Sequence, residues 1–339
     1  MTFATDCQPP KLNSIMPRGT MAAQTDSGDC CDYRATVTNP RLIPSEHPYR
    51  VTPIRAGGFR LDGGAMFGLI PRTIWETWIA PDAHNRIALA TNCLLLDDGS
   101  RKVLVETGYG DKWSDKERAI YQLAPRTISD ALREQGVEPE SIDHVIVTHL
   151  HFDHAAGLTR RGAGDALERT FPNAEIVVQQ REWDDAIANR STMTRTYLPS
   201  HLEPIRSAVR LLDGPTEALP GIVVRPLVGH TWGQHGVFVR DERGGITVFP
   251  ADLIPTRHHV HLAANMGYDV LPYENMLSKR EFLAEAAGEG WRLVLDHEPS
   301  QPIVRAERDP ADPSRHVLVP VAGESIPAAP EDRPSTTSG

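Results

Sequence analysis

Three histidines and an aspartate occur within six residues of this chain, in the string HLHFDH at positions 149–154. The string follows a short apolar run, 145–148, that has the composition of a buried strand. If the chain is extended there, His149 and His151 face the same side, and the next two ligand-type residues follow where the chain must turn. Imidazoles and a carboxylate without a thiolate are typical ligands of catalytic zinc. We therefore interpret the string as part of a metal centre and not as a chance cluster on a solvated loop.

Further ligand-type residues stand near the ends of later strand-like runs. His230, Asp252 and His297 each come within three residues of the end of such a run. The runs are Ile222–Val228, Ile246–Phe249 and Arg292–Leu295. Since strand ends at one sheet edge commonly build a site, we expect these residues to join the string at 149–154. Glu106 is a candidate acceptor for a ligand imidazole, and Asp296 either orients His297 or is exposed.

Strand-like and helix-like stretches alternate in two batches, and each batch ends on helices. Strand-like runs lie at 86–96, 102–106, 145–148 and 174–179, and then at 222–228, 235–240, 246–249, 292–295, 303–306 and 317–321. Helices are expected at 127–135, 181–189 and 278–287. This order predicts an α+β domain in which two β-sheets pack face to face with helices outside.

The ends of the chain differ in composition from its middle. Residues 1–46 are rich in Pro, Ser, Thr, Asp and Gly and show no hydrophobic period, so a disordered leader is expected there. Residues 324–339 are rich in Pro, Ser and Thr and are expected to form a disordered tail. The single predicted domain is 47–323.

The composition of the chain indicates which kind of molecule it binds. The net charge of −10, without a dense Lys/Arg cluster, argues against nucleic acid and favours a small-molecule substrate. No apolar run is long enough to predict a membrane span, and no secretory signal pattern is present, so we expect a cytoplasmic protein. Cys7, Cys30, Cys31 and Cys93 are expected to be free thiols. A homodimer is left open.

These residues together resemble the metallo-β-lactamase superfamily. The matching segments are HLHFDH at 149–154, GHTWGQH at 229–235, ADL at 251–253, DH at 296–297 and, with Glu in place of Asp, ETG at 106–108. The resemblance spans roughly residues 50–310 and implies an αββα sandwich of two mixed sheets with helices outside. It also implies two Zn²⁺ ions, the first held by His149, His151 and His230, the second by Asp153, His154 and His297, with Asp252 bridging them.

The ligand spacing points to one branch of the superfamily. A histidine at position 151 argues against the diiron flavoprotein branch, which has Glu there. Asp153 precedes His230 by 77 residues, His230 precedes Asp252 by 22, and Asp252 precedes His297 by 45. This layout is similar to that of the N-acyl-homoserine lactonases and of the methyl parathion-type organophosphate hydrolases.

The resemblance implies hydrolysis of an ester-like bond, above all a lactone, by a hydroxide that bridges the two metals. Asp252 and Asp153 would then be the catalytic carboxylates. An organophosphate, another ester or a thioester is the alternative substrate. A metal-binding protein without catalysis is the alternative outside the enzymes.

The sequence indicates the residues of the substrate pocket less directly than it indicates the metal ligands. The lactonases carry a substrate-contacting Tyr three residues after the bridging Asp, where this chain has Pro255; Tyr268 and His258 are candidate replacements. A glycine-flanked loop brings Met66 and Phe67 to its tip. Because early hairpin loops overhang the metals in this superfamily, we expect both side chains to line an apolar pocket, with burial in the core as the alternative.

Overall fold

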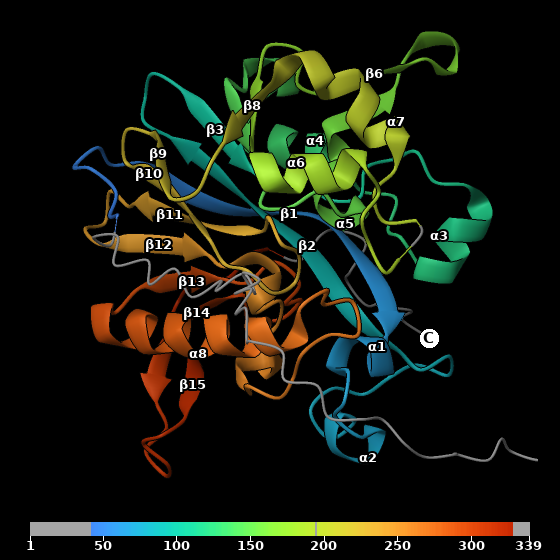
Figure 1. The fold of residues 1–339 in the computed structure, drawn as a ribbon. Helices are drawn as coiled ribbons and strands as arrows, with labels where there is room; N and C mark the ends of the chain where they lie inside the picture. The colour runs from blue at the N-terminus through green and yellow to red at the C-terminus, as the bar shows by residue number, and fades with distance from the viewer. Residues whose placement is uncertain (1–41, 194, 328–339) are drawn as a thin grey trace, which may run out of the picture. The chain divides into compact units, whose positions relative to one another are not determined.

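The computed structural model describes residues 42–193 and 195–327 (Figure 1). Most of the expected leader, with Cys7, Cys30 and Cys31, lies outside the described residues, as does the expected tail from residue 328 onward. Cys93 is a free, buried cysteine.

Two mixed sheets form the centre of the described domain. The first has the strand order β1-β2-β3-β4-β7-β8 and the second β15-β14-β13-β12-β11-β10-β9. The first contains β1 (Arg50–Asp62), β2 (Arg86–Asp97), β3 (Lys102–Val105), β4 (His144–Ile146), β7 (Glu175–Gln179) and β8 (Val209–Leu212). The second contains β9 (Thr216–Leu219), β10 (Ile222–Pro226), β11 (His235–Arg240), β12 (Ile246–Phe249), β13 (Arg292–Val294), β14 (Ile303–Arg308) and β15 (His316–Pro320). A separate pair comprises β5 (Thr159–Arg161) and β6 (Leu167–Arg169).

Helices connect and cover these strands. The α-helices are α1 (Gly63–Phe67), α2 (Arg72–Trp75), α3 (Asp115–Tyr121), α4 (Ile128–Arg133), α5 (Phe152–Ala155), α6 (Gln180–Ile187), α7 (Pro199–Leu202) and α8 (Pro272–Glu289). Short 3₁₀ turns are η1 (Pro139–Ser141), η2 (Ala156–Leu158), η3 (Ala163–Asp165), η4 (Glu203–Ala208), η5 (Ala251–Leu253) and η6 (Arg257–Val260). Within the described ranges, no helix combines the length and apolarity that a membrane span requires.

Alternation along the strands produces four layers. In β2, Cys93 and Leu95 face a core shared with α4 and α6, whereas Leu94 and Leu96 face the second sheet. The other face of the second sheet packs on α8, chiefly through Phe282. In Figure 1, α8 lies along one side of the sheets, and α4 and α6 lie on the other. The predicted αββα sandwich is therefore confirmed.

The first strand was not expected from the sequence. Pro53, Gly57 and Gly58 interrupt its apolar pattern, and these residues normally indicate turns. The strand nevertheless pairs with β2 along almost its whole length, with a bulge between Arg55 and Gly57 that absorbs the irregularity. Pairing with a long, apolar partner strand thus overrides the local signals.

The domain extends beyond both expected boundaries. The amide of Ser45 donates to Glu217 Oε1 at 2.9 Å, so the residues just before 47 are attached to the second sheet. After residue 323, Glu324 Oε2 accepts a hydrogen bond from Arg292 Nε at 2.8 Å. Ile326 is only 6% exposed and belongs to the core between the sheets. The expected limits of 47 and 323 are thus too narrow, because these polar segments contain a few residues that complete the core.

Ile326 gives a direct test of this boundary. Ile326→Ala should lower the free energy of unfolding by about 2 kcal/mol, because it removes buried methyl groups and leaves a cavity between the sheets. Denaturant unfolding of the full chain measures the change. Val319→Ala, in a residue that is 37% exposed, is the control and should stay within about 0.5 kcal/mol of the wild type. Equal stability of the two variants would show that residues beyond 323 contribute nothing to the core.

Candidate metal centre

The first ligand residues lie between β4 and α5. β4 is flanked by β3 and β7 in parallel register, which makes it a central strand of the first sheet. Beyond its carboxyl end the chain reaches His149 and His151, whose ring centroids lie 4.6 Å apart. α5 then carries Asp153 and His154. All four side chains are buried.

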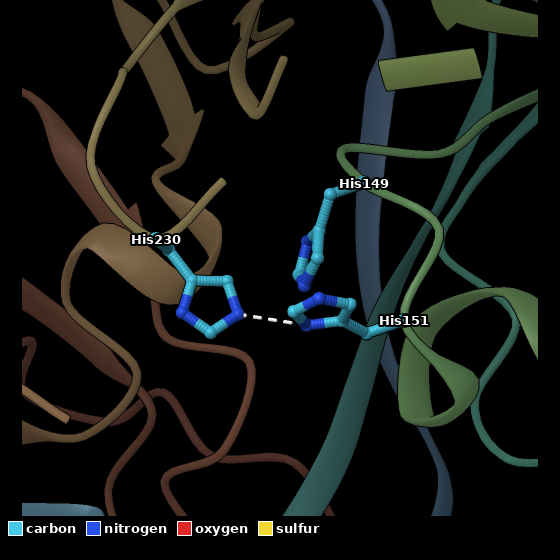
Figure 2. A group of neighbouring side chains, drawn as sticks. All are labelled: His149, His151 and His230. Atoms are coloured by element: carbon cyan, nitrogen blue, oxygen red, sulfur yellow. Dashed lines mark hydrogen bonds between the residues drawn. The ribbon is translucent and has the colours of Figure 1, made fainter. Parts of the chain in front are cut away.

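The other ligand residues come from the second sheet. His230 lies in the loop between β10 and β11, Asp252 in η5 after β12, and His297 after β13. Figure 2 shows His230 approaching His149 and His151 from the opposite side of the site, with 2.9 Å between His230 Nε2 and His151 Nδ1. Ends of strands from both sheets therefore meet at one site.

The carboxylate of Asp252 lies at the centre of this arrangement. Its Oδ2 is 3.0 Å from His230 Nε2, 3.7 Å from His154 Nε2 and 3.8 Å from His149 Nε2. Its Oδ1 is 3.1 Å from His297 Nε2. The two oxygens thus face different imidazoles, as the position of a bridging ligand requires.

The outer nitrogens of the rings contact the surrounding protein. Nδ1 of His230 donates to Asp269 Oδ1 at 2.9 Å, Nδ1 of His297 donates to the carbonyl oxygen of Ala90 at 2.8 Å, and Nδ1 of His154 lies 3.2 Å from Glu106 Oε2. Contacts of this kind orient a ring and leave Nε2 as its ligand atom. Glu106 therefore lies where the sequence suggests an acceptor for a ligand imidazole.

The buried donor atoms fall into two groups that fit two metal ions. His149, His151 and His230 form one group, and His154, Asp252, Asp296 and His297 form the other; within each group the ligand atoms lie within 4.8 Å of one another. Four of these five imidazoles have a buried Nε2 that makes no hydrogen bond among the described residues. Atoms that share one zinc at about 2.0–2.2 Å lie roughly 3–4 Å apart. The separations around Asp252 have this size.

One further carboxylate, Asp153, lies beside the second group, and one member of that group, Asp296, is placed by its own backbone contact. Asp153, expected there, has its oxygens 3.8 Å from His154 Nε2 and 3.6 Å from His297 Nε2. Asp296 is 1% exposed, and its Oδ1 accepts a hydrogen bond from the His297 amide at 2.9 Å. The sequence leaves Asp296 undecided between orienting His297 and being exposed; it is not exposed.

The carboxylates and imidazoles shift one another's protonation. Burial, and then the neighbouring imidazoles, hold the pKa of His149 well below its usual value, so this ring is a neutral ligand at pH 7. Burial also lowers the pKa of His297, but the charges of Asp296 and Asp252 outweigh it and raise this pKa to about 10. The carboxylates of the second group therefore require positive charge beside them, which protons or a divalent ion can supply.

Two buried carboxylates that the sequence analysis missed hold the ligand loops. Glu182, in α6, accepts hydrogen bonds from the Leu150 amide at 2.9 Å and from Thr231 Oγ1 at 2.6 Å. It thereby ties together two ligand loops, one from each sheet. Asp269, besides its bond to the His230 ring, accepts from Asn275 Nδ2 at 2.9 Å. No sequence pattern marks either residue, because each lies far along the chain from the loop that it supports.

A cavity of about 420 Å³ adjoins the ligands. Five ligand residues line it: His151, Asp153, His230, Asp252 and His297. Its apolar wall consists of Leu61, Met66, Phe152, Met193 and Met266, and Tyr121, Tyr268, Thr192, Thr196 and Arg195 add polar groups. The site is thus accessible to a molecule with an apolar part.

Two of the four pocket residues expected from the sequence line this cavity. Met66 and Tyr268 belong to its wall. Phe67 does not, because its side chain is fully buried in an aromatic cluster behind the cavity. His258 is absent from the wall as well, and its ring stacks on Trp78 at 6.2 Å between centroids. Adjacent residues of the short helix α1 point in different directions, which is why only one of Met66 and Phe67 reaches the cavity.

Comparison with known families identifies the domain. The family model described as the metallo-beta-lactamase superfamily matches residues 86–297, which is more than half of the chain. This range runs from the start of β2 to His297 and includes all seven predicted ligands.

Curated relatives include N-acyl homoserine lactonases. One from Bacillus thuringiensis is 28% identical over 178 residues, which cover 49% of this chain and 65% of the lactonase. One from Bacillus cereus is 25% identical over 186 residues, which cover 52% of this chain and 68% of the lactonase. The chain thus spans just under two thirds of the length of the Bacillus thuringiensis relative.

Solved structures share the fold. A probable metal-dependent hydrolase from Staphylococcus aureus superposes with a TM-score of 0.72 at 24% identity, covering 84% of this chain and all of that one. AidC, a dizinc quorum-quenching lactonase, superposes with a TM-score of 0.67 at 18% identity, covering 84% and 97%. The sandwich, the ligands at its strand ends and the family match lead to one conclusion: this chain belongs to the metallo-β-lactamase superfamily.

Proposed function

We propose that this chain is a dinuclear zinc hydrolase that opens a lactone ring, with N-acyl homoserine lactones as its substrate class. One observation carries the proposal: five ligand residues line a cavity whose wall is largely apolar. A site that only stored metal would not need room for an acyl-sized molecule beside its ligands. The similarity to N-acyl homoserine lactonases supports the choice of a lactone among ester-like substrates.

The ligands divide as the two groups suggest. His149, His151 and His230 would hold one ion, and Asp153, His154 and His297 would hold the other, with Asp252 placed to contribute to both. Zinc bound there would supply the acidity that activates a water molecule and the positive charge that stabilises oxygen atoms as they become negative. The protein's own contribution is to keep these side chains oriented and the acyl chain away from water.

The two catalytic carboxylates have different tasks. Asp252 holds the two halves of the site together, since its oxygens face imidazoles of both groups. Asp153 lines the cavity, so its carboxylate can take up the proton that the attacking water loses as it bonds to the carbonyl carbon and can pass it to the leaving alkoxide as the ester bond breaks. This step needs a carboxylate within reach of the substrate, which Asp153 provides.

Tyr268 provides the substrate hydrogen bond that Pro255 cannot. Burial, and then the charges of Asp62 and Asp153, raise the pKa of its phenol, so the hydroxyl stays protonated and can donate to a substrate oxygen. Its loop is attached to the metal centre, because the amide of Val270 donates to the carbonyl oxygen of His230 at 3.0 Å. The carbonyl oxygen of Pro255 instead accepts the amide of His297 at 3.0 Å.

Metal content provides the first test of this proposal. Elemental analysis of purified, folded protein should find close to two transition-metal ions per chain, mainly zinc, because the buried donor atoms form two groups of metal-ligand type. Dialysis against a chelator should remove both ions and the lactonase activity. A folded sample that never met a chelator and still holds no metal would refute the proposal.

Asp252→Asn tests the shared ligand. The variant should fold but retain less metal, and its kcat should fall at least ~100-fold, which corresponds to about 2.7 kcal/mol of lost transition-state stabilisation. Asp312→Asn, in the loop between β14 and β15 and not part of either ligand group, is the control and should retain the metal and the turnover of the wild type. Turnover by Asp252→Asn close to that of the wild type would exclude the bridging role.

Acyl chain length tests the substrate class. We expect kcat/KM for N-acyl homoserine lactones to rise with chain length, because each CH₂ buried against the apolar wall contributes about 0.8 kcal/mol. Met66→Ala should flatten this trend. Leu69→Ala, in a residue nearby that is 96% exposed, should leave it unchanged. Inertness to every lactone, together with cleavage of phosphotriesters, would favour the organophosphate alternative.

A further inference from the structure

One carboxylate of the site has no task in the proposed reaction. Asp296 follows β13 and directly precedes His297. Its side chain is 1% exposed, and only one of its oxygens is engaged: Oδ1 accepts the amide of His297 at 2.9 Å. Oδ2 makes no hydrogen bond with any described residue and lies 3.8 Å from His297 Nε2. The contact with the His297 backbone therefore explains the position of Oδ1 but gives Oδ2 no partner.

The free oxygen faces the second ligand group. The ligand atoms of His154, Asp252, Asp296 and His297 all lie within 4.8 Å of one another. A carboxylate oxygen that is buried without a hydrogen-bond donor is unfavourable unless a cation lies against it. A divalent ion in this group would satisfy that oxygen.

Glu298, two residues further on, shows the contrast. It is also buried, at 3% exposure, but both of its oxygens have donors outside the ligand groups. Oε1 accepts the amide of Ser300 at 3.1 Å, and Oε2 accepts the amide of Arg257 at 3.2 Å. Burial in this segment thus does not by itself leave a carboxylate oxygen unpaired.

The two groups differ in the chemistry of their donors. The first offers three imidazoles, and Asp252 of the second group lies beside them. The second offers two imidazoles, the same Asp252, the adjacent Asp153 and the free oxygen of Asp296. Imidazole ligands suit zinc, whereas carboxylate ligands suit ions such as Mn²⁺. The second group is therefore richer in oxygen than the first.

We propose that Asp296 is a further ligand of the second metal ion, and that its oxygen lets this position accept Mn²⁺ as well as Zn²⁺, whereas the first position favours Zn²⁺. The inference rests on the proposed two-metal site and adds to it a ligand and a difference between the two positions. A chain loaded with one equivalent of Zn²⁺ should then accept Mn²⁺ as its second ion.

The experiment uses the full chain, freed of metal and loaded with one equivalent of Zn²⁺. Binding of Mn²⁺ at the second position is measured by titration, with calorimetry and electron paramagnetic resonance as the two readouts. Asp296→Asn keeps an oxygen for the His297 amide but replaces the free carboxylate oxygen. It should weaken Mn²⁺ binding at least ~100-fold, beyond the loss of 10–100-fold that is typical when a group merely orients a ligand. It should weaken binding of a second Zn²⁺ less.

Glu298→Gln is the matched control, because it removes a buried carboxylate two residues away that does not face the ligands. It should leave Mn²⁺ binding within a few-fold of the wild type. Asp296→Glu, which restores a carboxylate, should recover part of the lost affinity. Manganese X-ray absorption of the wild type should show mainly oxygen ligands, and this measurement needs no variant to fold.

The outcomes separate the two proposals. If the wild type binds two ions and Asp296→Asn weakens Mn²⁺ less than ~100-fold, Asp296 is only a positioning group and the inference is overturned while the proposed function stands. A manganese environment dominated by nitrogen would overturn it in the same way. If the wild type binds fewer than two ions, the proposed function fails and this inference fails with it.

Discussion

The carboxylate of Asp252 is buried among imidazoles from both sheets, and the other residues of the site must hold those imidazoles in place around it. Its oxygens lie 3.0 Å from His230 Nε2 and 3.1 Å from His297 Nε2. A charge in such a place is unfavourable unless its neighbours are held in position. The surrounding hydrogen bonds do this: Asp269 holds one of these rings, and the Ala90 carbonyl holds the other.

The sandwich supplies the rigid frame for these contacts. Along single strands, successive side chains point in turn into the core between the sheets and into an outer core. A shift of a strand by one residue would therefore expose apolar side chains. Strands β4, β10, β12 and β13 can then deliver ligands to one place although 148 residues separate His149 from His297. Glu182 adds a polar tie between loops of the two sheets. Precision at the site therefore depends on packing well away from it.

The substrate side of the site is built differently. A fourth apolar cluster, around Phe67 and Trp75, lies beside the metal centre and supports the segment that carries Met66. Met66 and Met266 belong to this cluster and also line the cavity. Thioether side chains adapt to irregular shapes, so this wall can adapt to apolar groups of different size. The cavity is therefore lined both by rigidly held metal-ligand residues and by adaptable apolar side chains.

Much of the architecture could be predicted because its signals are local. Alternating apolar runs indicated most strands of both sheets, and three helices were expected near α4, α6 and α8. The helix α8 is longer than expected: it begins at Pro272, whose fixed φ suits a first turn, and ends at Glu289, where Gly290 with a φ of 66° caps it. The strand β1 was missed because its one proline and two glycines normally indicate turns, whereas pairing with β2 imposes an extended conformation.

By itself, the sequence indicated seven candidate metal ligands, because residue type and position after a strand-like run are local features. The structure brings all seven candidates together. Only the tertiary structure decided which of Met66 and Phe67 enters the cavity, because that depends on what packs behind α1. It also decided the roles of Asp269 and Asp296. Each of these carboxylates is an ordinary surface-type residue in sequence, and acquires a role only where distant segments bury it beside an imidazole.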